Sequence, residues 1–88
     1  MEVTIMDAKM TKDEESGYVG QVVFQLPGER NVYELTLQSK KARDWGYSLH
    51  FAKESGTEEE LEAMEERLEE DDELFDRLVG EAMSRLQD

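Results

Sequence analysis

The chain has 88 residues, no cysteine and a formal net charge of −13 at pH 7. This length fits one domain, 1–88, and the missing cysteines exclude disulfide bonds, thiolate catalysis and cysteine metal sites. The start of the chain has no basic segment followed by an apolar run, and no apolar stretch approaches the roughly 20 residues that span a bilayer, so we expect a cytoplasmic protein without membrane contact.

Four stretches alternate between large apolar side chains and small or polar ones, which predicts strands over residues 2–9, 18–26, 32–38 and 45–53. The links between them are short, so consecutive strands are expected to pair as an antiparallel meander. One predicted face carries Val3, Ile5, Val22, Phe24, Leu26, Tyr33, Leu35, Leu37, Trp45, Tyr47, Leu49 and Phe51. The sheet should therefore pack on this face and meet water on the other.

The apolar period becomes helical after Thr57, which together with Glu60 has the sequence of a capping box. A single stripe about 100° wide then holds the apolar residues. Its members are Leu61, Met64, Leu68, Phe75, Leu78, Val79, Ala82 and Leu86.

Two aspartates, Asp71 and Asp72, interrupt this stripe where an apolar residue is due. Aspartate is a poor residue inside a helix and a good N-cap. We therefore predict helix over 58–70 and 73–86, either kinked or divided into two segments. The predicted fold is α+β in two layers, in the order β-β-β-β-α(-α): a four-stranded antiparallel meander sheet with one face covered by C-terminal helix.

Negative charge is concentrated in the predicted helices. Residues 57–88 hold 14 acids and three bases, a net charge of −11, whereas residues 1–56 have a net charge of −2. Such a field repels nucleic acid and anionic membranes and attracts basic surfaces at low salt. The expected partner is a protein with a basic surface, and we expect contact with neither nucleic acid nor membrane.

The most acidic stretch, residues 65–76, is a candidate cation site because Glu69, Asp72 and Asp76 cluster at helical spacing. An EF-hand loop, however, needs a central glycine and spaced oxygen ligands, and this stretch has leucine and phenylalanine inside the would-be loop. We therefore predict no metal site here and interpret the three carboxylates as part of a solvated partner surface.

A catalytic centre is not expected. The only histidine, His50, falls on the polar face of the fourth predicted strand, where a flat sheet offers no pocket for a nucleophile, a base and an orienting acid. The sequence has no phosphate-binding glycine pattern, and nothing distinguishes one of its many carboxylates as buried. We predict no catalytic residues, no cofactor and no enzymatic activity.

Two further surfaces are candidates for partner contact. The first is a basic link between the third and fourth strands with Lys40, Lys41 and Arg43, which could also meet the acidic helix of a second copy. The second is a mildly apolar strip on the open sheet face, formed with His50 by Val19, Val23, Val32 and Thr36.

The function expected from these features is that of a small acidic cytosolic protein of the non-catalytic, protein-binding or regulatory kind. One alternative is an acidic mimic of nucleic acid, whose helix carboxylates stand in for phosphates on a basic protein surface. A structural homodimer or a carboxylate-based enzyme would also agree with the composition.

Overall fold

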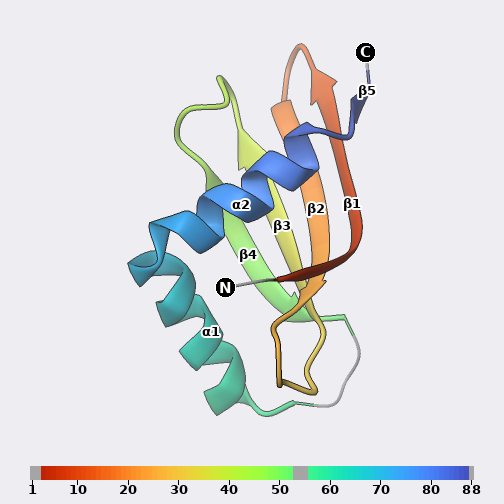
Figure 1. Cartoon of the computed structure of the whole chain (residues 1–88). Helices are drawn as coiled ribbons and strands as arrows, with labels where there is room; N and C mark the ends of the chain where they lie inside the picture. The colour runs from red at the N-terminus through yellow and green to blue at the C-terminus, as the bar shows by residue number, and fades with distance from the viewer. Residues whose placement is uncertain (1–2, 53–55, 88) are drawn as a thin grey trace.

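We describe the protein from a computed structural model, which places residues 3–52 and 56–87. Within these ranges the chain forms one five-stranded sheet with two helices on one face (Figure 1). Its elements in chain order are β1 (Thr4–Asp13), β2 (Gly17–Gln25), β3 (Tyr33–Ser39), β4 (Gly46–Phe51), α1 (Glu58–Glu70), α2 (Asp72–Met83) and β5 (Leu86–Gln87). β1 to β4 form an antiparallel meander, and the predicted two-layer α+β fold is confirmed.

The element ends differ from the predicted ranges by more than one residue in three elements. β1 continues four residues beyond the predicted 2–9, β4 is shorter than 45–53, and α2 ends before residue 86. Residues 2 and 53 of the predicted strands lie outside the described residues. Leu86 belongs to β5, which pairs parallel with β1 at the sheet edge (Figure 1). A two-residue strand is too short to produce a period in the sequence, so it was not predicted.

β1 contains an irregularity that changes which of its side chains face the core. The register against β2 shifts between Ile5 and Asp7, and the extra residue, Met6, is 54% exposed. A bulge of this kind reverses the inward phase of the residues that follow it. Ala8 and Met10 are therefore buried, although unbroken alternation omitted both from the predicted core.

The core lies between the sheet and the helices. Its centre is a stack of aromatic rings, with Tyr33 between Phe24 at 5.6 Å and Phe51 at 5.5 Å. α2 crosses β1 and β2, whereas α1 lies along the β4 side of the sheet (Figure 1). Several side chains predicted as core are only partly buried at its edge: Ile5, Trp45, Tyr47, Phe51, Leu61, Phe75, Val79 and Leu86.

The predicted break between the helices is confirmed at Asp71. Its backbone N–H donates to the Arg67 carbonyl at 2.8 Å, which ends α1, and its side chain accepts from the Leu74 N–H at 3.1 Å, which starts α2. Because of the break, α2 is rotated about its axis relative to a continuation of α1. Leu74 is therefore buried together with Leu78 and Ala82 at i, i+4 and i+8. The single-stripe prediction missed Leu74 because it assumed one continuous helix.

Candidate functional site

The side of the two helices that points away from the sheet is strongly acidic. Of the 12 carboxylate side chains in α1 and α2, ten are exposed. We call these ten the acidic outer face. They are Glu58, Glu59, Glu60, Glu62, Glu66, Glu69, Glu70, Asp72, Glu73 and Asp76.

This face arises from the pattern that buries the opposite side of each helix. In α1, Met64 and Leu68 point to the core, which turns Glu62, Glu66 and Glu70 outward at i, i+4 and i+8. In the described part of the chain these three carboxylates take part in no side-chain hydrogen bond or ion pair. Like charges at this spacing destabilise a helix, so the fold gains nothing from them.

Glu60 is a member of the acidic outer face that also stabilises the fold. Its Oε1 accepts from the Thr57 N–H at 3.0 Å, and the Glu60 N–H donates to the Thr57 hydroxyl at 3.2 Å, so the predicted capping box is present. Its Oε2 accepts from the buried Asn31 amide at 2.7 Å, which ties the β2–β3 loop to α1. The Asn31 hydrogen bond, followed by the one from Thr57, lowers the pKa of the Glu60 carboxyl.

A small hollow of about 200 Å³ lies beside this tie, lined in part by Tyr33, Glu29 and Glu60. The Tyr33 hydroxyl donates to Glu29 at 3.2 Å. Burial raises the pKa of Tyr33, and the charges of Glu29 and Glu60 raise it further, so the hydroxyl stays protonated at neutral pH. A carboxyl acting as general acid at neutral pH needs a raised pKa, and that of Glu60 is lowered.

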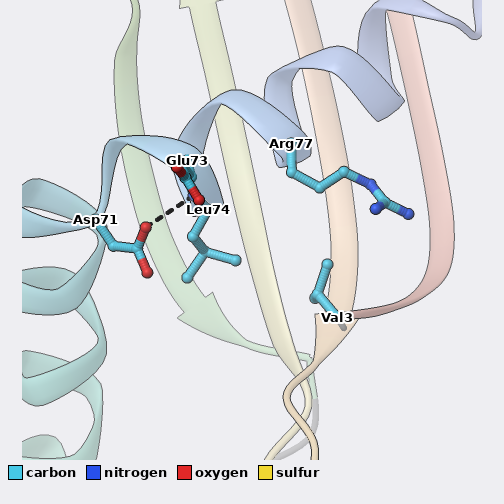
Figure 2. A pocket seen from close by; sticks show the side chains of 5 residues that line it. All are labelled: Val3, Asp71, Glu73, Leu74 and Arg77. Carbon is cyan, nitrogen blue, oxygen red and sulfur yellow. Dashed lines mark hydrogen bonds between the residues drawn. The ribbon is translucent and has the colours of Figure 1, made fainter. Parts of the chain in front are cut away.

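A second hollow, of about 150 Å³, lies at the start of α2 (Figure 2). Val3 and Leu74 form its apolar wall, and Asp71, Glu73 and Arg77 line its rim. Figure 2 shows the Asp71 carboxylate turned to the Leu74 N–H, while the Arg77 guanidinium extends away from Asp71. Two carboxylates and one guanidinium line this hollow, so its net negative lining disfavours an anion.

In the described part of the chain, Glu69, Asp72 and Asp76 are not placed to share a cation. The helix break separates Glu69 on α1 from Asp72 and Asp76 on α2, and Glu69 accepts from the Tyr47 hydroxyl at 3.5 Å. Burial, then the charges of Glu69 and Glu65, raise the pKa of Tyr47. Within residues 3–52 and 56–87, no three acidic or histidine side chains are placed to hold a metal ion.

The open face of the sheet is a grid of mixed side chains. Pairing places Asp7, Val23, Glu34 and His50 in one row across β1 to β4, so polar groups flank Val23 on both sides. The next row holds Lys9, Gln21, Thr36 and Ser48, and the third holds Thr11, Val19, Gln38 and Gly46. Val19 is 40% exposed, and a whole row separates it from Val23. Val32, half-buried, precedes β3 and accepts from the Ala52 N–H at 2.9 Å.

The basic residues Lys40, Lys41 and Arg43 are exposed on the β3–β4 loop. This loop lies beside the β1–β2 turn, at the end of the sheet opposite the first turn of α1 (Figure 1). In the described part of the chain, none of the three cations forms an ion pair with a carboxylate. The loop surrounds a hollow of about 470 Å³, whose lining includes Ser39.

Two polar residues important to these surfaces were not predicted, the buried Asn31 and Ser39. Neither stands in a motif, and their burial depends on which loop packs above them. A scan against protein-family models and searches of curated proteins and solved structures found no match to this chain. None of the helices in the described ranges has the length and apolar character needed to cross a membrane.

Proposed function

We propose that this chain is a small, non-catalytic cytoplasmic binding module that docks its acidic outer face on a basic surface of another protein. The observation that carries the proposal is the separation of Glu62, Glu66 and Glu70 from every stabilising contact in the described part of the structure. Charges that repel one another and stabilise nothing in the free protein gain a role when a basic surface neutralises them.

The shape of the helical layer supports the same proposal. α1 and α2 are joined at Asp71 with no loop between them, and Tyr47 fastens this junction to the sheet through its 3.5 Å hydrogen bond to Glu69 and its ring contact with Phe75 at 5.5 Å. The carboxylates are thus presented from two helices on a fixed frame. A rigid presentation lowers the ordering entropy lost on binding.

A symmetric contact between two copies of the chain through this surface is disfavoured, because two acidic outer faces would repel each other. A mimic of nucleic acid is the second candidate, favoured by the spread of exposed carboxylates along two successive helices. In that case the basic surface of the partner is one that binds nucleic acid, and a DNA or RNA duplex competes with this protein for it.

The test compares two variants with the same change of charge. Glu62→Gln/Glu66→Gln/Glu70→Gln alters the acidic outer face, and Asp13→Asn/Glu14→Gln/Glu15→Gln alters the exposed β1–β2 turn. Each variant and the unaltered protein are immobilised and exposed to native cell extract at low and moderate salt.

We expect that a protein with a basic surface binds to the unaltered chain and to the variant of the β1–β2 turn. The same protein should not bind to the variant of the acidic outer face, which we call the helix variant. Its binding should weaken between low and moderate salt as the charges are screened. Equal retention by both variants, or retention that salt does not affect, would refute the proposal. If a DNA or RNA duplex competes with this protein for the partner, the result favours the second candidate function, a mimic of nucleic acid.

A further inference from the structure

A second binding site, outside the acidic outer face, is indicated by the loop between β3 and β4. We propose that residues 39–44 form a site for a phosphate group, in the free ion or in a small phosphate monoester. The observation behind it is a hollow of about 470 Å³ lined by Ser39, Lys40, Lys41, Arg43 and Asp44.

The charge of this hollow is opposite to that of the molecule. Three cations and one carboxylate line it, a local balance of +2 in a chain whose net charge is −13. In the described part of the chain the three cations have no carboxylate partner within ion-pair distance. Lysine and arginine side chains grouped in this way are the usual ligands of phosphate oxygens.

The Ser39 hydroxyl gives the site a donor that the cations alone would not provide. Ser39 is only 7% exposed, lines the hollow, and makes no side-chain hydrogen bond in the described part of the structure. None of the described side chains leaves a buried polar atom without a partner, so the Ser39 oxygen keeps contact with solvent at the lining of the hollow, where it is able to donate to an anion.

The loop is held in shape before any ligand binds. Ser39 pairs with Tyr18 in the β2–β3 ladder, and the Trp45 ring meets the Tyr18 ring at a centroid distance of 6.3 Å, so both ends of the loop are fixed on one residue. Gly17 allows the close approach, because a Cβ there would lie 2.6 Å from the Lys40 Cα. Between these anchors Ala42 adopts a left-handed backbone with φ 59°, a strained conformation that recurs at ligand sites.

A phosphate group fits these features better than a polyanion does. Three cations are few for a nucleic acid, and the charge of −13 repels an extended anionic chain. A single phosphate group interacts mainly with the charges that line the hollow, because at physiological salt the charges more than about 8 Å away are screened.

The experiment is an NMR titration of the whole chain with inorganic phosphate, followed through the backbone amides at constant pH and ionic strength. We expect saturable shifts confined to residues 39–44 and their neighbours. Lys41→Ala/Arg43→Ala should weaken binding about tenfold, since each removes a charge-assisted hydrogen bond. The matched variant Lys9→Ala/Arg30→Ala removes the same charge elsewhere and should change the affinity less than about twofold.

Two single variants separate specific contact from general attraction. Ser39→Ala should weaken phosphate binding without a change of charge, and Asp44→Asn should strengthen it by removing the opposing carboxylate. Parallel titrations with 5′-AMP and O-phosphoserine identify which molecule supplies the phosphate group. If one ester binds more tightly than the other, that ester represents the natural class of ligand. If both bind equally, the site recognises the phosphoryl group alone.

Shifts that do not saturate, or that weaken equally in both double variants, would overturn the proposal in favour of diffuse attraction. Tighter binding of a glutamate-rich peptide than of phosphate would overturn it in favour of a protein contact. Both double variants replace only exposed side chains, and their amide spectra report directly whether the fold is intact.

Discussion

The two sides of the helical layer differ in what they contribute to the folded chain. The inner side is closed to solvent, with Leu78 and Ala82 both 0% exposed, whereas the outer side carries ten exposed carboxylates. Packing against the sheet determines the inner residues, so they report on the fold. Glu62, Glu66 and Glu70 on the outer side are free of that constraint, and their mutual repulsion opposes folding, so we relate them to binding and not to the fold.

The largest expected effect is on the inner side. Leu78→Ala should lower the free energy of unfolding by about 2–5 kcal/mol, because it leaves a cavity under α2. Urea denaturation measures it, with Asp76→Ala on the same helix as the control. The control should change stability by about 0.5 kcal/mol or less, and similar losses in both variants would remove the distinction between the two sides.

The next effect is at the helix junction. Asp71→Ala removes the acceptor of the Leu74 N–H and should cost about 0.5–2 kcal/mol of stability. Asp71→Asn keeps a side-chain oxygen at the same place and should retain most of it. If the alanine and asparagine variants unfold at the same urea concentration, the capping role assigned to Asp71 is wrong.

Gly80 tests whether every outer residue has a binding role. It is exposed, and a Cβ added there meets nothing within 4 Å. Gly80→Ala should therefore raise stability by about 0.5–1 kcal/mol through helix propensity and leave partner binding unchanged. Gly20→Ala is the contrasting variant, because its Cβ would lie 2.7 Å from the Lys9 carbonyl, and it should destabilise the sheet. A loss of stability in Gly80→Ala would show an unrecognised contact.

A comparable gain is expected from the acidic outer face itself. Glu62→Gln/Glu66→Gln/Glu70→Gln removes three like-charge i,i+4 pairs, because Glu58 also lies four residues before Glu62, and should raise stability by about 0.6–1.5 kcal/mol at low salt. Glu70 contributes further, because the last turn of a helix disfavours negative charge. In 1 M NaCl, where the screening length is about 3 Å, the advantage over the unaltered chain should nearly vanish. Thermal unfolding at both salt concentrations measures it.

The smallest effect separates Glu60 from the other outer carboxylates. Its pKa is lower in the folded chain than the ordinary value of 4.5, so its stabilisation is present above that pH and is lost as the pH falls below it. Glu60→Gln should flatten the acid side of the stability curve, whereas Glu59→Gln should leave its slope unchanged. Identical curves for the two variants would contradict the tie between Glu60 and Asn31.

The sequence was sufficient to predict the meander, the helix positions and the break between them, because alternation, helical period and aspartate capping are local signals. The predicted core was incomplete where one residue changes which of the following side chains face inward. The bulge at Met6 turns Ala8 and Met10 inward, and the break at Asp71 turns Leu74 inward, so the regular periods omitted these three residues. The acidic outer face follows from the helical period. The environments of Asn31 and Ser39 depend on contacts with segments distant in sequence, α1 for Asn31 and β2 for Ser39, which no local pattern encodes.

The central claim is that Glu62, Glu66 and Glu70 of the acidic outer face serve binding at the expense of folding. The most direct measurement takes one sample of Glu62→Gln/Glu66→Gln/Glu70→Gln and determines both its free energy of unfolding and its affinity for a deca-arginine peptide, beside Asp13→Asn/Glu14→Gln/Glu15→Gln. The account predicts that the helix variant is more stable than the unaltered chain and binds the peptide more weakly than the turn variant does. A helix variant that is less stable, or that binds as tightly as the turn variant, would contradict it.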